Sequence, residues 1–188
     1  FDELAGKIDA AVLAAPTTLH GELGLALLER GVHLLVEKPI ASTLAEADAL
    51  IAAAQAHDRV LAVGHVEFHN PAVQALLDAG TGPRFIEIER LGTFSPRSLD
   101  VDVILDLMIH DLQILQAMDS SPVVEVRAVG IPVLSERIDI ANARIEFANG
   151  CVANLTASRI SLKQMRKMRL FQPDAYISLD FLDKNAQI

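Results

Sequence analysis

Glu37, Lys38 and Pro39 stand directly after the short apolar run Val32–Val36. A run of this length and composition predicts a buried strand. In α/β sheets, ligands bind beyond the carboxyl ends of the strands, where polar side chains can face a cofactor. We therefore expect Glu37 and Lys38 to belong to a ligand site. Taken alone, the motif could also be a solvated Glu-Lys pair at the start of a loop.

Asp106 and His110 are the second pair that could do chemistry, because they lie four residues apart within the mostly apolar segment 103–112. On a helix this spacing places both side chains on one face, one turn apart. A carboxylate at that distance can orient an imidazole for general acid–base catalysis. The alternative is a core histidine that is satisfied by a neighbouring carboxylate.

His65, Glu67 and His69 offer a third set, with two imidazoles four residues apart. On a helix such a pair can chelate zinc. Here the three residues follow a predicted strand end and run into Asn70-Pro71, where a helix is not expected to include them all. We therefore expect no metal site, and keep a metal-dependent enzyme as an alternative.

The first part of the chain alternates predicted strands and helices, with short connections between them. Ser42 or Thr43, together with Glu46, predicts a capping box. This order of elements predicts a parallel, doubly wound sheet. The strands are expected at residues 8–14, 32–36 and 60–63, and the helices at 17–30 and 44–56.

From Pro83 onward the pattern changes to strands of period two, at 85–90 and 123–129. Asn149-Gly150 and Pro173-Asp174 each predict a hairpin turn. An apolar helix at 101–118 interrupts the series. The sequence therefore predicts a partial Rossmann-type α/β domain at residues 1–75, followed at 76–188 by an α+β domain with an open, mainly antiparallel sheet.

Composition limits the class of protein. The 188 residues carry a formal charge of −9, which argues against a protein that binds the nucleic-acid backbone. No apolar run is long enough to span a membrane, and the first residues do not resemble a signal or transit peptide. Cys151 is the single cysteine, which is compatible with a reducing, cytoplasmic location. We expect Cys151 to be a small core residue.

Glu-Lys-Pro at a strand end, followed by Asp-x-x-x-His on an apolar helix, resembles the Gfo/Idh/MocA oxidoreductase family. Val63-Gly64-His65 after the third predicted strand fits the same resemblance. The members are two-domain enzymes that use NAD or NADP and act mostly on sugars, nucleotide sugars and cyclitols. The resemblance implies a dehydrogenase acting on a CH–OH group of a small-molecule sugar or nucleotide sugar, in a homodimer or homotetramer.

The resemblance also implies roles for individual residues. Glu37 would contact the cofactor, and Lys38 would lie beside the nicotinamide and the reacting hydroxyl. Asp106 and His110 would bind the substrate, with His110 as the acid/base, although either Lys38 or His110 could take the proton first. The cofactor side would be completed by residues around the first predicted strand end, namely Ala15, Pro16, Thr17 and His20.

The chain departs from the family pattern at several points. No G-x-G-x-x-G turn precedes the predicted strands, so we expect the first βαβ unit with its Gly-rich loop to be absent. Compared with the family, we also expect the second domain to be incomplete at its C-terminal end. Met108 and Gln113 replace a usual glycine and acid. Phe68-His69 replaces a usual Arg-Phe. A non-catalytic module that binds a sugar or a cofactor is therefore a further alternative.

Segments 105–111 and 171–178 resemble a subgroup that is associated with 3-dehydrogenation of UDP-N-acetylglucosamine. That resemblance implies a nucleotide-sugar substrate.

Overall fold

The computed structural model describes residues 6–79, 82–95 and 99–187. They form two compact units, Phe1–His65 and Val66–Ile188, and each is described by itself. The sequence placed the boundary after residue 75, whereas the units divide after His65. The reason is that the short helices following His65 pack against the later helix and the last strand of the second unit.

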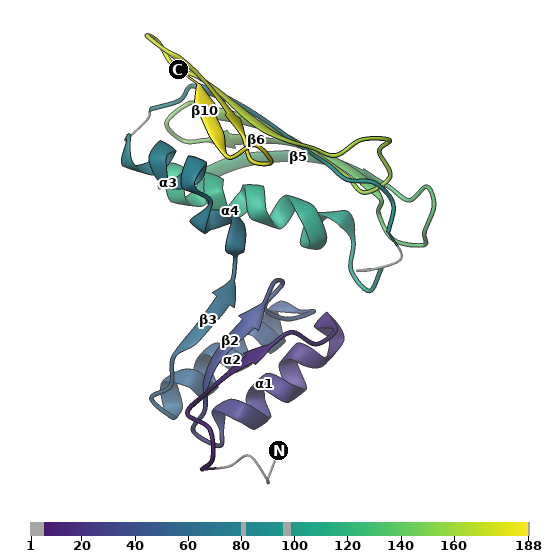
Figure 1. Ribbon diagram of the computed structural model, residues 1–188. Helices are drawn as coiled ribbons and strands as arrows, with labels where there is room; N and C mark the ends of the chain where they lie inside the picture. Colours follow the sequence, from purple (N-terminus) through teal and green to yellow (C-terminus); the bar gives the residue numbers. More distant parts are fainter. Residues whose placement is uncertain (1–5, 80–81, 96–98, 188) are drawn as a thin grey trace. The chain divides into compact units, whose positions relative to one another are not determined.

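The first unit is a three-stranded parallel sheet with the order β1-β2-β3. Two helices, α1 and α2, pack against each other and against one face of this sheet (Figure 1). This is the predicted Rossmann-type pattern, with both helices on the same side. The elements are β1 (Ala10–Leu13), η1 (Thr17–Leu19), α1 (His20–Leu28), β2 (His33–Glu37), α2 (Leu44–Ala56) and β3 (Leu61–Gly64).

Local sequence signals explain where these helices begin and end. The Thr43 side chain accepts a hydrogen bond from the Glu46 N–H, and the Glu46 carboxylate accepts one from the Thr43 N–H, which forms the predicted capping box. Gly31 adopts a φ of 79° after the end of α1, a conformation that favours glycine. The predicted cap at Thr17 or Thr18 is replaced by the 3₁₀ turn η1, which leads into α1 without a side-chain cap.

The second unit is a seven-stranded sheet with the order β10-β9-β8-β4-β7-β6-β5. Its central strand, β4, is parallel to β7 and antiparallel to β8. The other pairings are antiparallel, and two of them, β6–β7 and β8–β9, are the hairpins that the turn signals predicted. The elements are η2 (Val66–His69), α3 (Pro71–Asp78), β4 (Phe85–Leu91), η3 (Ile104–Met108), α4 (Ile109–Met118), β5 (Val123–Ile131), β6 (Ile140–Phe147), β7 (Val152–Ser158), β8 (Met165–Phe171), β9 (Tyr176–Asp180) and β10 (Asn185–Gln187).

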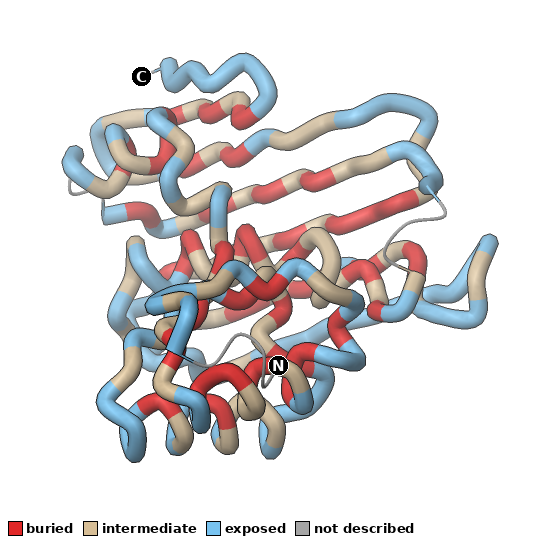
Figure 2. The backbone as a smooth tube through the Cα atoms, turned by 60° about the horizontal axis from the view of Figure 1, so that its bottom comes forward, coloured by how far each residue is buried: buried red, intermediate tan, exposed pale blue. Residues whose placement is uncertain are grey.

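Helices α3 and α4 lie over one face of this sheet (Figure 1). Buried residues alternate with less buried ones along the central strands (Figure 2), so the core lies between the helices and this face. The edge strand β5 differs from the prediction, because its residues are exposed on both sides apart from Glu125.

The predicted helix at 101–118 consists of two parts. Ile104–Met108 is a π-helical turn, and α4 continues from Ile109 to Met118. The Asp102 carboxylate accepts hydrogen bonds from the N–H groups of Ile104 and Leu105 and so caps the segment. Such π turns inside α-helices are frequent at functional sites. In the described part of the chain, none of the helices is long and apolar enough to cross a membrane.

Candidate functional site

His20 connects the loops that follow β1 and β2. Its ring nitrogens Nδ1 and Nε2 each lie 2.9 Å from a backbone oxygen, that of Pro39 and that of Ala15, respectively. The side chain is only 1% exposed. A neutral imidazole donates to one of these carbonyl oxygens, and the buried ring packs between the two loops from inside the unit. Pro16 is exposed beside Ala15, and Thr17 is buried at the start of η1.

Glu37 and Lys38 lie at the carboxyl end of β2, where the sequence placed them. Glu37 is directly opposite Gly64 in the β2–β3 register. A Cβ atom on residue 64 would lie 2.9 Å from Oε2 of Glu37, so the missing side chain makes room for the carboxylate. The Lys38–Pro39 peptide bond is cis. A half-buried carboxylate and a lysine thus lie next to each other at the carboxyl end of β2.

His65 follows β3, and the charges of both of these side chains affect its pKa. Burial lowers the pKa of His65, the positive charge of Lys38 lowers it further, and the negative charge of Glu37 opposes both. The three side chains therefore form one electrostatic group beyond the strands. A carboxylate can accept hydrogen bonds from ligand hydroxyls, and a group of polar side chains beyond the carboxyl ends of parallel strands is where such sheets bind ligands.

In the second unit, Asp106 lies in the π turn and lines a pocket of about 200 Å³. The lining combines side chains from the end of β4, from η3 and from the segment leading into β8. Its polar groups can donate and accept hydrogen bonds. The pocket is lined by Gly92, Thr93, Ser95, Asp106, Leu107, Arg159, Gln164 and Arg166.

His110 is 8% exposed and lies in the first turn of α4. Asp106 and His110 therefore straddle the junction of the π turn with α4, rather than sharing one regular α-helix as the sequence suggested. Their predicted cooperation stays a prediction.

Asp111, next to His110, is a buried residue whose role the sequence did not reveal. Its carboxylate accepts hydrogen bonds from Nε and Nη2 of Arg90, at 3.0 and 2.7 Å. Both side chains are 2% exposed. Although burial alone would lower the pKa of Arg90, Asp111 and Glu67 raise it, so the guanidinium stays charged. The alternation along β4 could have revealed that Arg90 is buried, because it follows Ile86 and Ile88 on the same, buried side of the strand.

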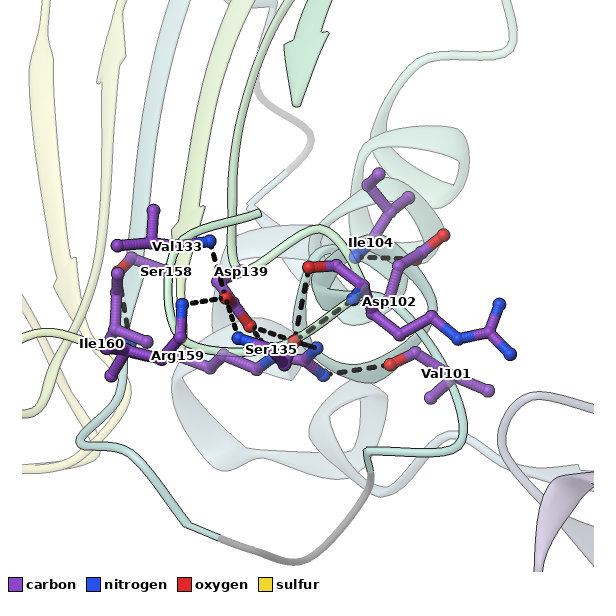
Figure 3. A network of polar contacts seen from close by, with 11 residues as sticks. Val101, Asp102, Ile104, Val133, Ser135, Asp139, Ser158, Arg159 and Ile160 are labelled. Carbon is purple, nitrogen blue, oxygen red and sulfur yellow. Dashed lines mark hydrogen bonds and ion pairs between the residues drawn. The ribbon is translucent and has the colours of Figure 1, made fainter. Parts of the chain in front are cut away.

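Arg159 and Asp139 form a second buried pair, which supports the pocket wall (Figure 3). Nε of Arg159 donates to Asp139 at 2.8 Å, and Nη1 donates to the Val101 carbonyl. Burial alone would raise the pKa of Asp139, but hydrogen bonds from Ser135, from the Val133 N–H and from Arg159 hold it well below its usual range. Arg159 is thereby fixed in place.

Two further candidates from the sequence are the metal-ligand set that includes Glu67 and the single cysteine, Cys151. Glu67 forms ion pairs with Arg90 and Arg166, which engages it away from a metal. Within the described ranges, no three His, Cys, Asp or Glu side chains are grouped to hold a metal ion. Burial and the charge of Asp119 raise the pKa of Cys151 to about 11, so its buried thiol stays protonated.

Comparison with known proteins identifies the family. Residues 1–65 match the family model described as "Oxidoreductase family, NAD-binding Rossmann fold". The UDP-N-acetylglucosamine 3-dehydrogenase of Acidithiobacillus ferrooxidans is 45% identical over all 188 residues. The chain belongs to the Gfo/Idh/MocA oxidoreductase family. This confirms the resemblance that the Glu-Lys-Pro and Asp-x-x-x-His motifs suggested.

Other Gfo/Idh/MocA relatives agree. A solved structure of the Acidithiobacillus enzyme matches 98% of this chain and 62% of that one, with a TM-score of 0.92 and 44% identity. A myo-inositol dehydrogenase of Streptomyces leeuwenhoekii is 31% identical over 83% of this chain and 53% of its own length. The chain spans 60% of the length of the Acidithiobacillus enzyme, to which it aligns throughout.

Proposed function

We propose that this protein is an NAD(P)-dependent dehydrogenase that oxidises a secondary alcohol of a sugar or nucleotide sugar. The observation that carries the proposal is the 45% identity with a UDP-N-acetylglucosamine 3-dehydrogenase. That match covers the whole chain, so it includes Glu37 and Lys38 at the carboxyl end of β2 and the segment with Asp106 and His110. We propose C3 of UDP-N-acetylglucosamine as the reacting position.

The reaction requires two transfers from the same alcohol. When bound, NAD or NADP accepts the hydride from carbon. The hydroxyl proton must leave to a base at the same time, and the Lys38 amine and the His110 imidazole are the two proposed acceptors. Glu37 would bind hydroxyls of the cofactor. Asp106 would orient the substrate by accepting from one of its hydroxyls.

Activity on a panel of substrates tests the proposal. UDP-N-acetylglucosamine, N-acetylglucosamine and myo-inositol would each be supplied with NAD or NADP, and the absorbance of the reduced nicotinamide would be followed. We expect the nucleotide sugar to give the highest kcat/KM. Binding of the sugar or the cofactor without any reduction would favour a non-catalytic module instead.

Variants test the two proton acceptors. Lys38→Ala and His110→Ala should each lower kcat/KM by about a hundredfold or more, because general acid–base catalysis contributes that much. Lys7→Ala and His57→Ala are matched controls at exposed positions and should retain activity. Full activity in Lys38→Ala or His110→Ala would remove that residue from the mechanism.

We also propose a homodimer or homotetramer. The support is the seven-stranded sheet, whose face opposite α3 and α4 carries half-buried and exposed residues, with Phe171 and Tyr176 among them. Light scattering on the purified chain would measure the mass, and a monomer at micromolar concentration would contradict the proposal.

A further inference from the structure

Arg90 and Arg166 are directly opposite each other on the antiparallel strands β4 and β8. Both lie on the helix-covered face, in phase with the buried residues Ile88 and Met168. Like charges that face each other across two strands destabilise a sheet. This pair therefore requires a negative charge nearby, and one is supplied from outside the sheet.

Glu67 in η2 supplies that charge. Its Oε1 accepts a hydrogen bond from Nη1 of Arg166 at 3.1 Å, and its Oε2 lies 3.6 Å from Nη1 of Arg90. The Glu67 side chain is 14% exposed. The guanidinium of Arg90 is held from the other side by Asp111 and lies 5.2 Å from the centre of the Phe181 ring. The Glu67 carboxylate thus forms ion pairs with two arginines.

Exposure increases along this series of ion pairs toward the pocket. Asp111 and Arg90 are 2% exposed, whereas the Arg166 side chain is 34% exposed and lines the pocket that contains Asp106. The buried end is fixed by a bidentate contact, which restrains the carboxylate of Glu67. Glu67 in turn restrains Arg166, so the outermost guanidinium is presented to the pocket in one orientation.

The charges around the pocket favour a neutral sugar ring. Arg166 is balanced by Glu67, and Arg159 is balanced by Asp139. Among the described residues that line the pocket, each arginine therefore already pairs with a carboxylate, which weakens its attraction for an anionic ring. Guanidinium groups only donate hydrogen bonds and a carboxylate only accepts them, whereas a hydroxyl does both. A ring that carries several hydroxyls matches this lining.

We propose that the Glu67–Arg166 pair determines substrate specificity, by presenting Arg166 as a donor to a neutral hydroxylated ring and by cancelling the charge that would attract an anionic one. This inference rests on the proposed function, since it assigns the sugar ring to the Asp106 pocket. Arg166 would touch the substrate. Glu67 would act through Arg166 as a positioning residue.

The test compares binding of N-acetylglucosamine with binding of glucuronate, each titrated into the full chain and followed by NMR. The wild type should prefer the neutral sugar. Glu67→Gln removes one negative charge and should shift the preference toward glucuronate by about tenfold, the effect expected for one charged hydrogen bond. Arg166→Gln should weaken the binding of N-acetylglucosamine by a similar factor. Glu67→Asp retains the charge and should restore the preference of the wild type.

Matched controls come from the same two strands. Glu87 and Arg169 are also directly opposite each other on β4 and β8, and they form an ion pair on the other face. Glu87→Gln and Arg169→Gln should leave the preference unchanged. If Glu67→Gln destabilises the core, Arg166→Gln still tests the inference, because its side chain is one-third exposed.

The outcomes separate this inference from the proposed function. An unchanged preference in Glu67→Gln, or undiminished binding of N-acetylglucosamine by Arg166→Gln, would overturn the inference. So would a wild type that binds glucuronate in preference to the neutral sugar. If the wild type binds the neutral sugar as described but reduces neither NAD nor NADP, the proposed dehydrogenase activity fails while the specificity of the pocket stands.

Discussion

Glu37 and Gly64 occupy one position of the β2–β3 register, and the carboxylate of Glu37 lies where a side chain on residue 64 would be. Gly64→Ala should push the carboxylate away, since the new Cβ would lie within 3.1 Å of both of its oxygens. We expect the affinity for NAD to fall about tenfold, which corresponds to roughly 1.4 kcal/mol. Calorimetric titration would measure it. Gly82→Ala, where a Cβ meets nothing within 4 Å, is the control. Unchanged affinity in Gly64→Ala would separate Glu37 from the cofactor.

His20 should contribute to both stability and cofactor binding. Replacing it by Ala leaves the carbonyl oxygen of Pro39 or of Ala15 without the ring N–H that it accepts from, which costs about 1–3 kcal/mol. Denaturant unfolding should show this loss, and the loosened loops at Ala15 and Pro39 should bind NAD more weakly. His57→Ala at an exposed position is the control. Weaker binding of NAD with an unchanged free energy of unfolding would instead indicate that His20 contacts the cofactor directly.

Lys38 and Glu37 should shift the titration of His65 in opposite directions. Lys38→Met removes a charge that lowers the pKa of His65, and Glu37→Gln removes one that raises it. NMR titration of the imidazole should therefore find a higher pKa in Lys38→Met and a lower one in Glu37→Gln. Equal pKa values of His65 in the two variants would contradict the proximity of His65 to Lys38 and Glu37.

The same group has a consequence for stability. A histidine whose pKa falls on folding stabilises the folded state above its unfolded pKa, near 6.5, and this contribution is lost as the pH falls through the folded pKa. Lys38→Met should therefore lose less stability than the wild type between neutral pH and pH 5. Urea unfolding at several pH values would measure the difference.

Asp139 should be a major source of acid sensitivity. Its pKa is held below the usual range, so its contribution to stability is present above the unfolded value, near 3.8, and is lost as the pH falls toward the folded pKa. Asp139→Ala leaves the buried Arg159 without its carboxylate, which should cost about 3–5 kcal/mol. Thermal unfolding would measure this. Glu125→Ala, in an exposed pair with Arg127, should change stability by less than about 1 kcal/mol.

The sequence predicted best where the cause is local. The capping box of Thr43 and Glu46, and the turn at Asn149-Gly150 with its φ of 86° at the glycine, depend on residues a few positions apart. The family followed from two short motifs in the right order. Lys38 and Glu37 were placed at a strand end, because the apolar run before them marks the strand.

The sequence did not reveal contacts between distant segments. Glu67, Arg90 and Arg166 come together only because η2, β4 and β8 meet in the fold. Each of them alone is typical of a solvated charge. The π turn around Asp106 was hidden for a different reason, since an apolar helix with one additional residue in a turn has nearly the same pattern as a regular helix.

The central place of β4 in the sheet affects the order in which the strands form. It lies between β7 and β8, two strands that are close to each other in the sequence but far from β4. The hairpins β6–β7 and β8–β9 can form early, because their loops are short. Insertion of β4 must close a much longer loop, and contacts of this kind slow folding. Pulsed hydrogen exchange should therefore find the amides of β4 protected later than those of the two hairpins, which makes the centre of the sheet its last part to form.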